Sequence, residues 1–205
     1  MRCARPIVFA AGVLALGGSC ARAQAPPAAT DPLTESGKVM VGGRPFEFLI
    51  RRLPVSSFPE LPAAIAARLV AAGCMIPQTY EAHRPENVVH ASLEHAGTTD
   101  WAVLCAAKGT VALLVFFASA PDKPTVLATA PETERLQSHD PSGVLGFNWG
   151  IDPASPEQVH ESQLGMKHRS MVTDHDALGD SIIEERIVYH YFARGRWMLL
   201  DVTGP

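Results

Sequence analysis

The sequence lacks any apolar run long enough to cross a bilayer. A transmembrane helix takes about 20 predominantly apolar residues, whereas the longest apolar run, from Ile7 to Leu16, has ten. Basic residues are also in the minority, with 17 Lys and Arg against 21 Asp and Glu, and no basic stripe follows any segment. An acidic balance disfavours nucleic acids and anionic membranes as partners. We therefore expect no integral membrane span and no nucleic-acid partner.

Common sequence signatures of enzymes are missing as well. The chain has no Gly-x-Ser-x-Gly nucleophile elbow, no P-loop and no dinucleotide-binding glycine pattern. Each of these motifs supplies a backbone geometry that its chemistry needs. Nothing in the sequence indicates a cofactor, and the site of any enzyme would have to assemble from distant residues. The sequence favours a binding or accessory domain for an unknown envelope or extracellular ligand.

The first 23 residues have the features of a secretory signal peptide. Arg2 and Arg5 precede the apolar run, and the small-residue segment Ala21–Ala23 follows it. These are the basic, apolar and cleavage regions of such a peptide. We expect residues 1–23 to be a signal peptide and the protein to be periplasmic or secreted.

A second mode of export is lipid attachment at a cysteine. The segment "LGGSC" ends at Cys20 and resembles a bacterial lipoprotein box, although Gly17 stands where that box usually has leucine. Anchoring at Cys20 is therefore the minor alternative to simple cleavage. Behind the signal peptide we expect a disordered leader over residues 24–37, which are rich in Pro, Ala and Thr, and a single globular domain over residues 38–205.

Only two cysteines lie beyond the signal region, at Cys74 and Cys105. In an oxidising compartment two lone thiols on one small domain usually pair. Closing a loop between positions 31 residues apart would stabilise the fold by about 3–4 kcal/mol in the chain-entropy model. The alternatives are two buried free thiols, or one catalytic thiol with a base beside it. We predict a disulfide.

Two segments have the pattern of helices. Residues 62–72 place Ile65 and Leu69 on one apolar stripe, begin after proline and end at Gly73, which is typical of a helix with one buried face. Residues 155–166 begin with Ser155 as an N-cap, followed by proline and an acid in the first turn. Cys74 would then lie directly after the end of the first helix.

Three apolar runs predict an antiparallel meander. Residues 86–95, 101–107 and 110–119 are separated by two short turns, and short turns connect antiparallel strands. The second and third runs are almost wholly apolar, so we expect central strands buried on both faces. Further strands are expected around residues 46–50, within residues 143–149 and on either side of residues 193–196. The predicted fold class is α+β, an antiparallel sheet with buried central meander strands packed by two or three helices.

The segment Asp174–Glu185 resembles a calcium-binding EF-hand loop in four places. It has acids at positions one and three, glycine at six and glutamate at twelve. Position five, however, is Leu178, which has no side-chain oxygen for a hard cation. We therefore expect Asp174 or Asp176 to cap a short helical turn that leads into the final strand.

The same segment is the first candidate for another metal. Three or four convergent ligands are needed to hold zinc, and His175 stands between Asp174 and Asp176. A metal-dependent hydrolase assembled around these three residues is the alternative function. Trp149, in "GFNWGID", is the better candidate among the tryptophans for an exposed, ligand-contacting aromatic, although packing in the core is the commoner role.

Three segments together resemble an uncharacterised family of exported bacterial proteins. They are "CMIPQTY", "ENVVHASLEHAGTTDWAVLCAAKGTVALLVFF" and "GRWMLL", which match the family's Cys-x-Ile-Pro-Gln segment, its Asn-Val and Asp-Trp-Ala-Val-Leu-Cys strands, and its closing Gly-Lys/Arg-Trp hairpin. The resemblance covers roughly two thirds of the chain beyond the signal region. It implies that Cys74 and Cys105 belong together. No activity is known for the family, so it implies no catalytic residue.

Overall fold

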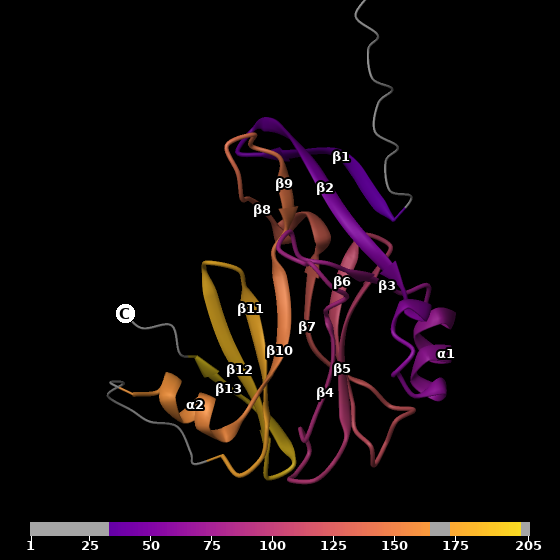
Figure 1. Cartoon of the computed structure of the whole chain (residues 1–205), viewed down its shortest axis with the longest axis vertical. Coiled ribbons are helices and arrows are strands. Elements are labelled where there is room, and N and C mark those ends of the chain that lie inside the picture. Colours follow the sequence, from indigo (N-terminus) through magenta and orange to yellow (C-terminus); the bar gives the residue numbers. More distant parts are fainter. Residues whose placement is uncertain (1–32, 165–172, 202–205) are drawn as a thin grey trace, which may run out of the picture. The chain divides into compact units, whose positions relative to one another are not determined.

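The computed structural model describes residues 33–164 and 173–201 (Figure 1). These residues lie in the second of two compact units of the chain, Asp31–Pro205. The expected signal peptide, Cys20 and residues 24–32 of the expected leader lie outside the described residues. None of the helices within 33–164 and 173–201 is long and apolar enough to span a membrane.

Strands make up most of the described chain. The strands are β1 (Thr34–Val41), β2 (Arg44–Pro54), β3 (Met75–Pro77), β4 (Val88–Ala91), β5 (Asp100–Ala107), β6 (Thr110–Phe116), β7 (Thr125–Pro131), β8 (Leu136–Ser138), β9 (Leu145–Phe147), β10 (Trp149–Ala154), β11 (Ala177–Ile182), β12 (Arg186–Ala193) and β13 (Arg196–Asp201). The helices are α1 (Ala63–Ala71) and α2 (Pro156–Ser162), with short 3-10 turns at Val55–Ser57 and Glu132–Arg135.

The strands form two sheets. The larger sheet has nine strands in the order β7-β6-β5-β3-β2-β9-β8, with β1 also paired to β2 and β4 to β5. Its pairs are antiparallel except for β2 and β9, which run parallel. The smaller sheet has four antiparallel strands in the order β10-β11-β12-β13. β10 contacts β4 and β5, so the two sheets share a core.

The predicted α+β class is wrong. The described chain is mainly β, with a mixed nine-stranded sheet, a separate four-stranded sheet and two α-helices. The expected meander exists as antiparallel pairing of β4, β5 and β6, but it is one part of the mixed sheet. The strand expected within residues 143–149 is present as β9, whereas β8 was missed because its three residues are too few to show a period of two.

The prediction of a disordered leader over residues 24–37 is wrong for its last four residues, because residues 34–37 belong to β1. The leader prediction relied on composition, whereas β1 is set by pairing along its whole length with β2. The tight turn between these strands explains the pairing. Gly42 and Gly43 have φ values of 56° and 79°, and consecutive residues with positive φ form the two-residue turn that suits a hairpin.

The strand β5 is apolar because it separates two cores. Leu104 faces the cluster that joins the two sheets, whereas Val103 and Cys105 face the cluster that contains α1. The prediction of burial on both faces is therefore confirmed for β5. It is wrong for β6, where Ala112 and Leu114 are only partly buried.

Both predicted helices are present. Ile65 and Leu69 are the buried residues of α1, as their spacing predicts. Ser155 caps α2 by accepting a hydrogen bond from the backbone N–H of Gln158, whose side chain in turn accepts from the backbone N–H of Ser155. This reciprocal capping box satisfies two backbone donors at the start of a short helix.

Cys74 and Cys105 lie at disulfide distance from each other. The Cα atoms of Cys74 and Cys105 are 5.3 Å apart, within the range that a disulfide spans. Both side chains are buried. The pair joins the chain just after α1 to the middle of β5, which confirms the predicted pairing.

Candidate functional site

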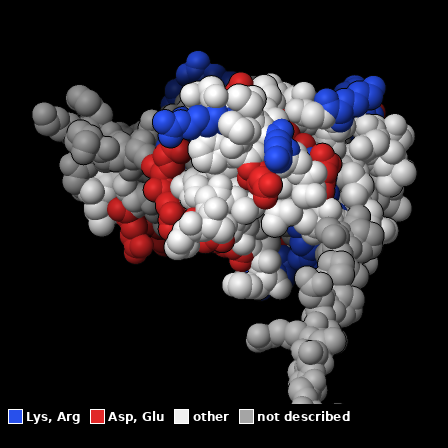
Figure 2. Space-filling view, turned by 90° about the horizontal axis from the view of Figure 1, so that it is seen from above, with Lys and Arg blue, Asp and Glu red and all other residues white. Residues whose placement is uncertain are grey.

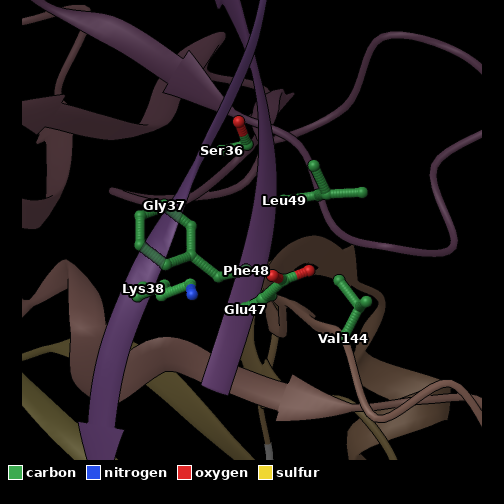
Figure 3. Close-up of a pocket in the computed structure, with 7 residues that line it drawn as sticks. All are labelled: Ser36, Gly37, Lys38, Glu47, Phe48, Leu49 and Val144. Atoms are coloured by element: carbon green, nitrogen blue, oxygen red, sulfur yellow. The ribbon is translucent and has the colours of Figure 1, made fainter. Parts of the chain in front are cut away.

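A groove lies along the hairpin of β1 and β2 (Figure 3). Its volume is ≈ 300 Å³, and its lining comprises Ser36, Gly37, Lys38, Glu47, Phe48, Leu49 and Val144. The ring of Phe48 lies against Gly37, where an added Cβ would come within 2.7 Å of the Phe48 ring. Glycine at this position therefore lets the ring lie flat across β1.

Strand register defines which side chains share the outer surface of the hairpin. Ser36 lies opposite Leu49, Lys38 opposite Glu47 and Met40 opposite Pro45. Paired residues, and alternate residues along a strand, point to the same face. We call the surface made by Ser36, Lys38, Met40, Pro45, Glu47 and Leu49 the hairpin face.

The hairpin face exposes large apolar side chains. Met40 is 63% exposed and Leu49 is 49% exposed, and both lie on the same side of a two-stranded ribbon. Lys38 and Glu47 lie opposite each other between them. The face therefore combines apolar contact area with one charge of each sign.

The outer edge of β1 adds main-chain groups to this surface. Within residues 33–164 and 173–201, β1 pairs with β2 and with no other strand. Edge strands present N–H and C=O groups that can pair with another chain. The hairpin face and this edge together form the candidate binding site.

An ion-pair cluster fixes the base of the hairpin. Arg52 of β2 donates to both carboxylate oxygens of Glu132, at 3.0 Å from Nε and 2.6 Å from Nη2, and its Nη1 donates to Glu35 of β1. The bidentate contact to Glu132 is the stronger geometry for an arginine–carboxylate pair. Arg52 thus ties both strands of the hairpin to the turn that follows β7.

The structure brings together two of the three predicted metal-site residues. His175 Nδ1 lies 2.7 Å from Asp174 Oδ1, but the Asp176 carboxylate instead accepts a hydrogen bond from the backbone N–H of Ser92. Among the described residues, no group of three or more His, Cys, Asp or Glu side chains could hold a metal ion. The geometry therefore does not support a metal site at these residues.

The predicted helical turn at this segment is wrong. Residues 174 and 175 form a bend, and β11 begins at Ala177. Neither aspartate caps a helix. Asp174 accepts a hydrogen bond from the Tyr191 hydroxyl of β12, and Asp176 accepts one from the backbone N–H of Ser92, directly after β4. β11 ends at Ile182, and a turn with a positive φ at Glu184 leads into β12.

Trp149 is not the exposed aromatic that the sequence suggested. Its side chain is fully buried, the guanidinium of Arg135 lies 4.5 Å from the ring centre, and its indole Nε1–H donates to Asp180 at 2.6 Å. The neighbouring glycines suggested a loop, but β10 begins at Trp149. Trp149 therefore has the role that is commoner for tryptophan, which is packing in the core.

Asp180 and His190 form a buried pair that the sequence analysis did not single out. His190 Nε2 lies 2.9 Å from Asp180 Oδ2, and both side chains are at most 10% exposed. They come from β11 and β12, ten positions apart along the chain. Their spacing across the hairpin of β11 and β12 would have indicated that the two side chains lie close together, but only if the register of the two strands had been known. This pair and Trp149 form a satisfied network in the core.

A second pocket is lined by carboxylates. It has a volume of ≈ 340 Å³ and is lined by Thr79, Glu81, Glu86, Asn87, Gly150, Ile151, Asp152, Ser181 and Ile183. Loss of hydration, and then the nearby Glu86 carboxylate, raise the pKa of Asp152 above its ordinary value. Asn87 is fully bonded here, to the carbonyls of Pro77 and Trp149 and to the Ile151 N–H.

Charged side chains of both signs share the surface. Figure 2 looks at the molecule from above and shows Lys and Arg dispersed among Asp and Glu, with uncharged surface between them. The hairpin face follows the same pattern, since Lys38 lies opposite Glu47. Recognition at this face would therefore rely on apolar contact and main-chain bonding more than on net charge.

Comparison with known proteins gives no match. No family model, no curated protein and no solved structure matches the chain.

Proposed function

We propose that the chain is an exported, non-enzymatic binding domain that holds an extended, partly apolar peptide segment against the hairpin face and the outer edge of β1. The observation that carries the proposal is the exposure of Met40 and Leu49 on one side of the hairpin. Leu49 lines the groove, and Met40 belongs to β1, whose outer edge pairs with no strand in the described part of the sheet.

Peptide addition to a sheet edge uses both features. Main-chain hydrogen bonds to the edge supply affinity, and side-chain pockets on one face supply specificity. A peptide strand beside β1 would place alternate side chains next to Met40 and Lys38. The apolar side chains would bury Met40 and Leu49, and polar ones would lie near Lys38 and Glu47.

Export is part of the same proposal. It is supported by the signal-peptide features of residues 1–23 and by the Cys74–Cys105 pair at disulfide distance. The resemblance to exported bacterial proteins agrees with it. A cleaved N-terminus after Ala23 or Ala25 in protein recovered from the envelope or the medium would support export, and an intact N-terminus on the cytoplasmic protein would contradict it.

A phage-displayed library of linear peptides, panned on the purified protein, tests the binding function. We expect enrichment of peptides with alternating apolar residues, and loss of their binding to the Leu49→Asp variant. The matched control is Leu199→Asp, because Leu199 is 65% exposed and lies on β13 of the other sheet. Failure to enrich any peptide, or equal loss in both variants, would contradict the proposal.

The metal-dependent hydrolase remains testable in the same material. Metal analysis of the purified protein, followed by thermal unfolding with added zinc or calcium, measures whether either ion binds. Stoichiometric metal, or an increase in Tm that Asp174→Asn abolishes, would favour the hydrolase over the binding domain.

A further inference from the structure

The outer edge of β1 presents a row of main-chain groups from every second residue. The N–H of Arg52 donates to the main-chain oxygen of Leu33, so these two residues form a hydrogen-bonded pair that continues the register of β1 with β2. Because hydrogen-bonded and non-hydrogen-bonded pairs alternate along an antiparallel ladder, the residues at even positions of β1 point their N–H and C=O groups away from β2. These residues are Thr34, Ser36, Lys38 and Met40.

This edge lacks the features that usually prevent strand addition. The register of β1 with β2 is uninterrupted over the 8 residues of β1, and β1 contains no proline. By contrast, β7 at one end of the larger sheet has a register shift against β6 between Leu113 and Leu114, and β8 at the other end has only three residues. Bulges, proline and short length blunt the edges of natural sheets. The edge of β1 is therefore suited to pairing with a further strand.

The sequence of β1 is complementary to itself about Gly37. Two antiparallel copies related by a two-fold axis at this residue would bring outward-pointing residues of one copy opposite outward-pointing residues of the other, which is the arrangement that hydrogen-bonded pairs need. The opposed pairs would be Gly37 with Gly37, Ser36 with Lys38, Thr34 with Met40, and Glu35 with Val39. None of these pairs sets two like charges against each other.

The neighbouring two-fold registers are less favourable. A pairing centred on Lys38 would place two lysines directly opposite each other, and like charges in that position are destabilising. A pairing centred on Ser36 would leave Met40 beyond the start of β1 in the second copy. A slip of one residue would set the outward-pointing groups of one copy against residues that already bond to β2. The register centred on Gly37 is therefore preferred.

Side chains on both faces fit the centre of this pairing. The Phe48 ring reaches across β1 at Gly37, where an added Cβ would come within 2.7 Å of it (Figure 3). Opposed residues of a non-hydrogen-bonded pair have Cα atoms about 4.5 Å apart, so one Phe48 ring from each copy would cover the paired glycines. On the hairpin face, Met40, which is 63% exposed, would lie against Thr34 of the second copy. Pairing would therefore cover apolar surface on both faces.

We propose that a second copy of this chain pairs with the outer edge of β1, antiparallel and centred on Gly37, and that this dimer competes with peptide for the edge. The pairing rests on the edge and register of β1 alone, whereas the competition also rests on the proposed function. A peptide and a second copy would use the same main-chain groups of β1, so their binding is mutually exclusive. Self-association therefore regulates the binding site, because the apparent affinity for peptide falls as the protein concentration rises.

Sedimentation velocity of the purified protein over a range of concentrations tests the pairing. Lys38→Pro removes the outward N–H of Lys38 from both copies and removes no bond to β2, so we expect self-association to weaken roughly tenfold or more. Lys38→Ala is the matched control, because it removes the same charge but keeps the N–H, and it should associate at least as tightly as the parent. Thermal unfolding checks that both variants are folded. A parent that stays monomeric at every concentration, or a folded Lys38→Pro protein that associates like the parent, would overturn the proposal.

The register is tested without any variant by NMR on a mixture of carbon-13-labelled and unlabelled protein. Hα atoms of a non-hydrogen-bonded antiparallel pair lie close together, so we expect a nuclear Overhauser contact between Gly37 Hα of the labelled copy and Gly37 Hα of the unlabelled copy. A dimer in which this contact is missing would overturn the proposal.

A synthetic peptide with the sequence of β1, TESGKVMV, serves as the competitor. It should dissociate the dimer, whereas the same peptide with proline in place of lysine should not, and an unaffected dimer would contradict the competition. A dimer paired through β1 without any enriched library peptide would contradict the proposed function and leave the pairing standing. An enriched peptide bound to a strictly monomeric protein would do the reverse.

Discussion

The hairpin face and the smaller sheet depart from the usual distribution of residues in opposite ways. The hairpin face exposes Met40 and Leu49, whereas the smaller sheet buries Asp180 and His190. Large apolar groups on a surface gain free energy when a partner covers them, so the first departure suits recognition. Polar and ionisable groups in a core are tolerated only when they are paired, so the second departure makes stability depend on specific hydrogen-bond partners.

Because the two regions differ in this way, we expect mutations in them to affect different properties of the protein. Changes on the hairpin face should alter binding and leave stability nearly unchanged, because the side chains already contact water. Changes to the buried polar groups should alter stability, since their partners cannot be replaced by water. The predictions below test this separation, beginning with the largest expected effect.

Asp180→Ala should have the largest effect on stability. Removing the carboxylate leaves both the Trp149 indole N–H and His190 without their acceptor in the core, and breaking a buried pair in this way costs about 3–5 kcal/mol. Denaturant unfolding followed by tryptophan fluorescence measures the loss. Asp180→Asn keeps an acceptor for Trp149 and should lose less, while Asp122→Ala, at an exposed position, should change nothing measurable. An Asp180→Ala protein as stable as the parent would show that the pair is not needed for folding.

Replacing Cys74 and Cys105 together with alanine should cost about 3–4 kcal/mol in the chain-entropy model. The link closes a separation of 31 residues and ties the end of α1 to β5. Its contribution does not titrate, so we expect the loss to be the same at pH 6 and pH 8. Unfolding curves of the oxidised parent and the double variant at both pH values provide the measurement. Mass spectrometry that finds both thiols reduced in exported protein would remove the basis of this expectation.

Glu132→Gln should have a moderate effect that reaches the hairpin. It removes the charge of Glu132 and one of the two acceptors that bind Arg52, and hydrogen bonds to charged groups contribute about 1.5–3 kcal/mol. We expect a loss near the lower end of that range, together with weaker binding of selected peptides. Glu134→Gln, at an exposed position in the same turn, is the control. A loss of stability with unchanged peptide affinity would show that the base of the hairpin does not influence the hairpin face.

Asp152→Asn should have the smallest effect, and it should stabilise. Loss of hydration and the Glu86 carboxylate raise the pKa of Asp152, so the folded state disfavours the ionised form. That penalty is absent below the ordinary pKa of about 4 and grows as pH rises through the raised value. At neutral pH the variant should gain no more than about 0.5 kcal/mol, and at pH 3 it should match the parent. A variant that is less stable than the parent at neutral pH would contradict the assigned direction.

Local patterns in the sequence predicted local structure well. The spacing of Ile65 and Leu69 and the cap at Ser155 located both helices, because helix signals lie within a few neighbouring residues. The apolar composition of β5 predicted its two buried faces for the same reason. The turn at residues 193–196 also joins the expected strands, β12 and β13.

Features that depend on long-range pairing could not be predicted. The parallel contact of β2 with β9 joins residues about a hundred positions apart, and β8, which has three residues, is too short to show alternation. The complete burial of Trp149 depends on contacts with Arg135 and Asp180, which reach it from other elements. The hairpin face was missed because the exposure of Met40 and Leu49 follows from the register of β1, which composition does not reveal.

The binding claim is tested most directly by mapping a selected peptide onto the protein with amide chemical shifts. We expect the largest changes at the β1 amides from Glu35 to Val41 and at Leu49 and Val144, together with new protection of β1 amides from solvent exchange. The smaller sheet should show no comparable changes. Shifts concentrated on β10–β13, or peptide binding without new protection in β1, would contradict the account.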